Sequence, residues 1–187
     1  CYAPNHPQKP DWGKREVKLT RELWIERGDF ALDPPKKYFR LKPDSEVRLR
    51  YGFIIKHVGH DVDEDGNVTC VYAEYDPDTK SGTPGADARK VKGNLHWLSA
   101  RDAVETSVRQ YDRLFREPAP GARREDDDAE LERDFLDDLN PDSIHTVTAY
   151  LEPGAANAEP ESIYQFERHG YFVADQQDHV PGRPVFN

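Results

Sequence analysis

Apolar and polar residues alternate along much of this chain with the two-residue period of β-strands. In EVRLRYGFIIKHV, residues 46–58, the apolar side chains at every second position alternate with Arg48 and Arg50. Since successive side chains of a strand face opposite sides, this pattern predicts that the two arginines share one face.

The same period predicts strands along most of the chain. A hairpin is expected from the runs at 52–61 and 67–75, because the Asp65-Gly66 step between them tolerates the positive φ of a tight turn. Further strands are predicted at 16–30 (two short ones), 38–41, 89–100, 143–152, 163–175 and 184–186.

Three segments lack a clear strand pattern. Residues 1–13, with three prolines and a glycine, predict an irregular leader. Residues 103–115 are compatible with a short helix that runs into a strand. In the acidic run 125–138, apolar side chains at helical spacing predict a short surface helix; they are Leu131, Phe135, Leu136 and Leu139.

Composition supports an all-β fold. Fifteen prolines and twelve glycines suit short strands and turns, and a length of 187 residues suits one large domain or two small ones. Two cysteines, Cys1 and Cys70, form no CxxC pair, which favours a reduced, cytoplasmic setting. There is no apolar run long enough for a membrane span. The start at Cys1 and the lack of methionine indicate a piece of a longer protein.

Charge is unevenly distributed. The formal net charge is −10, which argues against general nucleic-acid binding, yet residues 36–57 carry seven Lys or Arg against two acids. Residues 125–138 carry nine acids and one Arg. The basic stretch includes Tyr38 and Phe39, and such a mixture of arginines and aromatic rings suits single-stranded RNA. A solvated strand face that prevents aggregation is the alternative.

Other chemistry has little support. The acidic residues at 61–66 resemble the start of a calcium loop, but Tyr72 stands where the bidentate Glu is required. His57, His60 and Cys70 offer only three donors for zinc. No nucleophile elbow, zincin, P-loop or dinucleotide motif is present, so the residues alone indicate no active site.

Three long segments change the balance between these readings. EVRLRYGFIIKH with its GNVT hairpin, RKVKGNLHWLSA and YQFERHGYFVAD resemble the C-terminal anticodon-binding region of the glutaminyl-tRNA synthetase family. PNHPQKPDWGKREVKL, LWIERGDF, YDPDTKSG, YDRLF and PVFN are also similar to that family and follow in the same order. Only the loops at 120–138 and 153–161 are individual to this chain.

The resemblance implies two antiparallel β-barrels like that of ribosomal protein L25, at 1–98 and 99–187, with short helical insertions and scope for strand exchange between them. The barrels would hold the anticodon loop of tRNA(Gln), with its bases splayed into separate pockets. By position, the resemblance assigns RNA contacts to Arg40 (a base), Lys37 (a polar contact), Arg48 and Arg50 (the first base and its phosphates), Gln165 and Arg168 (the central uridine), and Pro7 (the linker near the loop).

Two departures from the family qualify these assignments. Lys37 and Phe39 stand where Gln and Lys are expected. An arginine before PNHP and a basic tail after PVFN lie outside this chain, so we expect weak binding. The resemblance also implies a monomer and a class I ligase whose ATP, with Mg²⁺, is held in a catalytic domain absent from these residues. The chain itself would carry neither a cofactor nor a catalytic residue.

Three alternatives remain open from the sequence. One is the anticodon-binding region of an archaeal or eukaryotic type of glutamyl-tRNA synthetase, although GNLHWLSA and QFERHGYF favour the glutaminyl family. Another is a free-standing L25-like barrel that binds ribosomal RNA, which would need only one barrel. The third is a protein-interaction module that uses the acidic segment 125–138.

Overall fold

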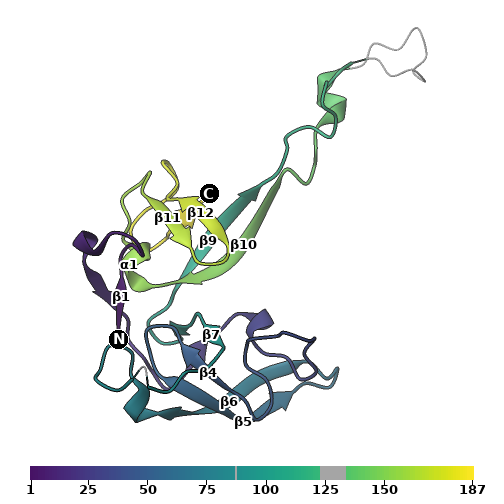
Figure 1. Ribbon diagram of the computed structural model, residues 1–187. Coiled ribbons are helices and arrows are strands. Elements are labelled where there is room, and N and C mark those ends of the chain that lie inside the picture. Colours follow the sequence, from purple (N-terminus) through teal and green to yellow (C-terminus); the bar gives the residue numbers. More distant parts are fainter. Residues whose placement is uncertain (87, 123–133) are drawn as a thin grey trace. The chain divides into compact units, whose positions relative to one another are not determined.

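The computed structural model describes residues 1–86, 88–122 and 134–187, and these divide into two compact units, 1–103 and 104–187 (Figure 1). Because the units are not placed relative to each other, each is described by itself. The strands of unit 1 are β1 (Tyr2–Pro4), β2 (Lys14–Glu16), β3 (Leu23–Trp24), β4 (Glu46–Leu49), β5 (Ile54–Val62), β6 (Val68–Asp76), β7 (Asn94–Leu95) and β8 (Leu98–Ser99). Those of unit 2 are β9 (Val104–Tyr111), β10 (Ile144–Leu151), β11 (Ile163–Phe166), β12 (Gly170–Val173) and β13 (Val185–Phe186).

Helix is scarce in the described residues. One four-residue α-helix, α1 (Pro153–Ala156), is accompanied by single turns of 3₁₀ helix at Pro10–Trp12, Arg27–Asp29, Pro77–Thr79 and Phe135–Asp138. The all-β class is therefore confirmed. The strands form separate open sheets, and none of the sheets in the described residues closes on itself. No helix in this part of the chain is long and apolar enough to cross a membrane.

Unit 1 is organised by a four-stranded sheet with the order β6-β5-β4-β7 (Figure 1). The β5–β6 hairpin is confirmed, and its turn is fixed because the Asp63 carboxylate accepts hydrogen bonds from the backbone N–H groups of Asp65 and Asn67. The alternation in β4 is also confirmed, since Val47 and Leu49 are each 1% exposed. Buried partners complete this core: Phe30, Leu41, Leu95 and Trp97.

The amino-terminal segment differs from the prediction of an irregular leader. β1 pairs antiparallel with β2, and Ala3 is fully buried. Within the intervening loop, Asn5 donates its backbone N–H to Gly13 and its side-chain amide to the Trp12 carbonyl. The prolines therefore occupy an ordered loop on a two-stranded ribbon, where missing N–H donors cost little.

Unit 2 contains the sheet β10-β9-β13 and the separate hairpin β11-β12. The alternative of a helix at 103–115 is wrong, because β9 runs from Val104 to Tyr111 and pairs with all eight residues of β10. Pairing with β10 and β13 overrides a local pattern that suited either structure. The core of this unit packs around Phe186, which is fully buried.

The acidic run is described only in part. Residues 123–133, including Leu131, lie outside the described residues. Beyond them, the predicted surface helix is a single 3₁₀ turn at Phe135–Asp138, which is capped by the Asp134 side chain and leaves Phe135 and Leu136 about half exposed.

Candidate RNA interface

Arg40 lies in a short segment that is anchored at both ends. A hydrogen-bonded turn joins the Pro35 carbonyl to the Tyr38 N–H, and Leu41, 1% exposed, donates its own N–H to the Asp29 carbonyl. Nε of Arg40 lies 3.0 Å from the carboxylate of Asp29, whose side chain is only 1% exposed. A buried acid thus fixes one edge of a guanidinium that is itself one-third exposed.

Phe39 and Gly93 connect this segment to strand β4. Phe39 is 49% exposed, and the Lys92 ammonium lies 6.0 Å from the centre of its ring. Gly93, which follows Lys92, accepts a hydrogen bond at its carbonyl from the Arg48 N–H. A Cβ atom at Gly93 would lie 2.5 Å from Val47 and 3.0 Å from the Phe39 carbonyl. This close approach, which only glycine permits, places the Arg40 segment beside the arginine-bearing strand.

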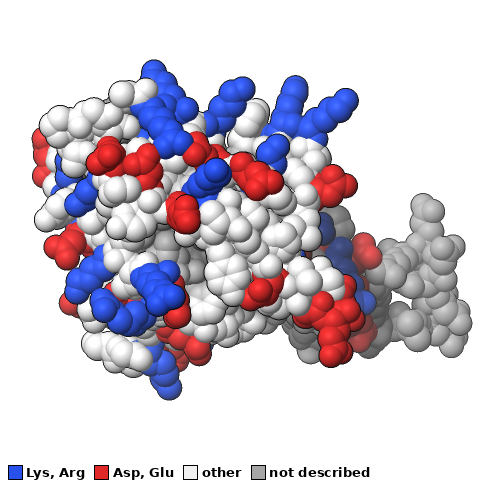
Figure 2. All heavy atoms as spheres, turned by 90° about the horizontal axis from the view of Figure 1, so that it is seen from below, with Lys and Arg blue, Asp and Glu red and all other residues white. Residues whose placement is uncertain are grey.

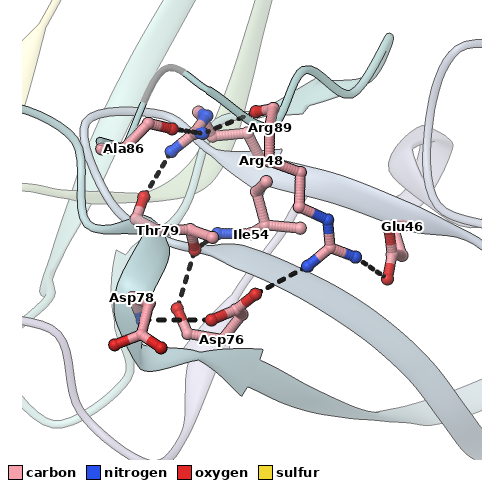
Figure 3. Close-up of polar contacts among 8 residues, drawn as sticks. All are labelled: Glu46, Arg48, Ile54, Asp76, Asp78, Thr79, Ala86 and Arg89. Carbon is pink, nitrogen blue, oxygen red and sulfur yellow. Dashed lines mark hydrogen bonds and ion pairs between the residues drawn. The ribbon is translucent and has the colours of Figure 1, made fainter.

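The Arg48 side chain points from β4 toward the carbonyls of Thr79 and Ala86 (Figure 3). Its Nη1 donates to the Thr79 carbonyl at 2.6 Å, and its Nη2 donates to the Ala86 carbonyl at 3.0 Å. Weaker contacts reach the carbonyls of Gly52 and Arg89 at 3.4 and 3.5 Å. The guanidinium therefore holds the 77–86 loop in place, because it satisfies carbonyls that would otherwise be left unpaired on partial burial.

A second arginine, Arg89, stabilises the same region. Arg89 forms an ion pair with Glu46 of β4 and another, at 2.6 Å, with Asp76 of β6 (Figure 3). The hydrogen bond and charge of Glu46 raise the pKa of Arg89, with a smaller contribution from Asp76. Sequence reasoning did not find this role for Arg89, because its acidic partners are distant along the chain.

Arg50 lies just past the end of β4, at the second position of a turn. The turn is closed by the Gly52 N–H, which donates to the Leu49 carbonyl, and Tyr51 occupies its third position with φ 62°. The Arg50 guanidinium carbon lies 5.2 Å from the Tyr51 ring centre, and the Arg50 carbonyl accepts the Trp97 indole N–H. A cation beside a partly exposed ring suits contact with a base or a phosphate.

Gln165 and Arg168 both lie on the β11–β12 hairpin of unit 2. Gln165 is an exposed strand residue that pairs with Tyr171, and Arg168 lies in the connecting turn with φ 69°. Pro7 lies in the exposed β1–β2 loop of unit 1. The seven proposed contact residues are thus distributed over both units.

Backbone strain coincides with two of these positions. Lys37, with φ 67°, and Arg168 both occupy the third position of a hydrogen-bonded turn, where glycine is favoured. A non-glycine residue in this left-handed region costs about 1–2 kcal/mol. Asp44, Tyr51 and Glu161 share this left-handed conformation, so the strain alone does not identify a contact residue.

The positive charge forms no continuous field on the face in Figure 2, where lysines and arginines are interspersed with acids. The rings of His57 and His60 lie within hydrogen-bond distance, at 3.2 Å. In the described part of the chain, no group of three His, Cys, Asp or Glu side chains is arranged to hold a metal ion. Of the assigned residues, Lys37, Arg50 and Arg168 lie on turns, where basic side chains can reach single-stranded RNA.

Comparison with known proteins identifies the class. Residues 1–76 and 94–175 match two family models, each described as the anticodon-binding domain of class I tRNA synthetases (E and Q). The chain belongs to this family of anticodon-binding domains, and the resemblance found in the sequence is confirmed.

Individual relatives give a more specific description than the family models. The chain is 59% identical to the glutamine–tRNA ligases of Ralstonia nicotianae and Cupriavidus taiwanensis, over 100% of its own length and 31% of theirs. It is 53% identical to the glutamine–tRNA ligase of Nitrosomonas europaea, over 100% of its own length and 32% of that relative. The chain thus spans about a third of the length of these curated relatives.

Proposed function

We propose that this chain is the anticodon-binding part of a glutamine–tRNA ligase and that its partner is the anticodon loop of tRNA(Gln). The observation that carries the proposal is the 59% identity to such ligases over all 187 residues. The matched stretch includes both anticodon-binding domains, which supports a contact surface that spans both of them.

The proposed contacts are those that the resemblance assigns by position, and the geometry of the turns supports them. Arg40, oriented by Asp29, contacts a base edge, and Lys37 lies on the preceding turn. Arg50 contacts the first anticodon base and its phosphates, while Arg48 supports the same region through the 77–86 loop. Gln165 and Arg168 contact the central uridine, and Pro7 lies near the loop.

The remaining parts of the proposal concern the whole ligase. ATP and Mg²⁺ are used in a catalytic domain outside these residues, and the protein acts in the cytoplasm as a monomer. The anticodon domains contribute specificity, because correct contacts favour the arrangement in which the acceptor end reaches the catalytic domain.

A charging assay tests this proposal. We expect the full-length ligase to aminoacylate tRNA(Gln) with glutamine and to lose kcat/KM when the CUG anticodon is changed to CUC. A control tRNA with a change in the variable loop should be charged as the parent is. Efficient charging of glutamate onto a tRNA with the CUC anticodon would instead favour the glutamyl members of the family.

A further inference from the structure

The β11–β12 hairpin has two different faces. On the inner face, the Phe166 and Phe172 rings stack with centroids 4.7 Å apart, and the Phe166 and Tyr164 rings contact Phe186 at 5.1 and 5.8 Å. These contacts attach the hairpin to the core of unit 2, so its outer face is held in a defined orientation.

The outer face carries exposed apolar side chains. Tyr171 and Ile163 are 76% and 75% exposed, the highest values among the large hydrophobic residues that the structure describes. The strand register places Tyr171 directly opposite Gln165. Residues paired in this way lie on the same face, with Cβ atoms about 5 Å apart. An aromatic ring and an exposed amide are therefore neighbours.

The turn of the hairpin brings a cation to the end of this pair. The His169 N–H donates to the Phe166 carbonyl at 2.9 Å, which places Arg168 at the third turn position with its strained φ of 69°. Glycine would relieve that strain. An arginine in its place puts a positive charge on the turn that joins the two strands, and positive charge is the complement of a nucleic-acid strand.

We infer that Tyr171 is a stacking platform for one unpaired base of the RNA, whose edge Gln165 contacts and whose phosphate or edge Arg168 contacts. The inference rests on the proposed function and adds to it a residue and a mode of recognition. The phenol ring offers a π-face to any base, whereas the amide of Gln165, which both donates and accepts hydrogen bonds, distinguishes base edges. An apolar protein partner would not use this combination of amide and guanidinium.

The test is a titration of the 187-residue chain against a CUG anticodon stem-loop. We expect Tyr171→Ala to weaken binding by roughly 5- to 100-fold through loss of one stacked base, and Tyr171→Phe to stay within about twofold of the parent. The matched control is Tyr111→Ala, which removes another tyrosine of unit 2 that is 62% exposed and should leave binding unchanged. Melting temperatures should be the same for all three variants.

A cross-linking measurement then locates the base. With 4-thiouridine at the middle anticodon position, irradiation should attach the RNA to the peptide that contains residues 163–173. Parent-like binding by Tyr171→Ala, or a cross-link elsewhere, would overturn the inference while leaving the proposed function intact. If the parent chain binds no stem-loop at all, both fail. If Ile163→Ala and Tyr171→Ala change only self-association, the face binds protein and the inference is wrong.

Discussion

The carboxylate of Asp29 and the guanidinium of Arg40 form an ion pair in which the acid is almost completely buried and the base is one-third exposed. This asymmetry suits a positioning role. Asp29 is held by the backbone that pairs with Leu41, so it presents a fixed partner to a side chain that would otherwise sample many rotamers.

Asp29→Asn should therefore weaken discrimination between CUG and CUC stem-loops. A loss of discrimination is diagnostic, because removal of a negative charge would by itself tighten the binding of both stem-loops. We expect the ratio of the two dissociation constants to fall by about fivefold, equivalent to about 1 kcal/mol. Titrations at two salt concentrations measure this ratio, and a ratio equal to that of the parent would exclude orientation of Arg40 by Asp29.

Arg48→Ala should lower the free energy of unfolding by about 1–3 kcal/mol, because it leaves partly buried carbonyls without donors. The 77–86 loop should also become sensitive to protease. Urea denaturation and limited proteolysis measure the two effects. The control is Arg21→Ala, an exposed arginine in the same unit, which should change stability by less than about 0.5 kcal/mol. Equal stability of both variants would show that Arg48 does not hold the loop.

Arg168→Gly and Lys37→Gly should separate stability from binding. Because glycine adopts positive φ without strain, each change should leave unfolding free energy unchanged or raise it by up to about 1 kcal/mol. RNA affinity should nevertheless fall. Glu161→Gly relieves the same strain at φ 67° in another turn and should not weaken binding. Undiminished affinity in the two basic variants would remove both residues from the interface.

Gly93→Ala should destabilise unit 1 by about 1–3 kcal/mol, because the new methyl group would lie 2.5 Å from Val47. RNA binding should fall with it, since the same glycine joins the Arg40 segment to β4. Gly82→Ala is the control without overpacking, because nothing lies within 4 Å of a Cβ there and its φ of +82° adds only backbone strain. Thermal melting of the two variants distinguishes overpacking from strain.

Acid should weaken unit 2 through Asp175. Hydrogen bonds from the Asp178 N–H, the Asn187 amide and the Gln177 N–H, with the charge of Arg109, lower the pKa of Asp175 from 3.8 to about 2. The unfolded carboxyl therefore takes up a proton at a higher pH than the folded one. The contribution of ionised Asp175 to the stability of unit 2 is present above about pH 4 and is lost as the pH falls toward 2. Asp175→Asn should flatten the stability of unit 2 over that window, as measured by denaturation at several pH values.

The sequence predicted the fold class and the β5–β6 hairpin because strand periodicity and turn residues are local signals, whereas the strand predicted at 163–175 is itself a hairpin, β11–β12. Val47 and Leu49 of β4 and the Asp65-Gly66 turn are examples. It could not predict the pairing of β1 with β2, which forms between residues separated by a loop, nor the strand at 104–111, where pairing with β10 decides a locally ambiguous pattern.

The proposed contact residues came from the resemblance, and the structure adds what surrounds them. Alternation indicated that Arg48 and Arg50 share a face, but it could not show that Arg48 is used on carbonyls of a loop 31 and 38 residues away. The role of Asp29 could not be predicted from the sequence either, because its burial and its contact with Arg40 depend on tertiary packing. The strain at Lys37 and Arg168 likewise exists only in the folded backbone.

The most direct test of the central claim is a titration of this chain against labelled stem-loops with CUG, UUG and CUC anticodons, at low and moderate salt. We predict tighter binding to CUG and UUG than to CUC, with a preference that persists when salt weakens all three complexes. A preference for CUC would assign the chain to the glutamyl members of its family, and equal binding to all three, abolished by moderate salt, would contradict anticodon recognition.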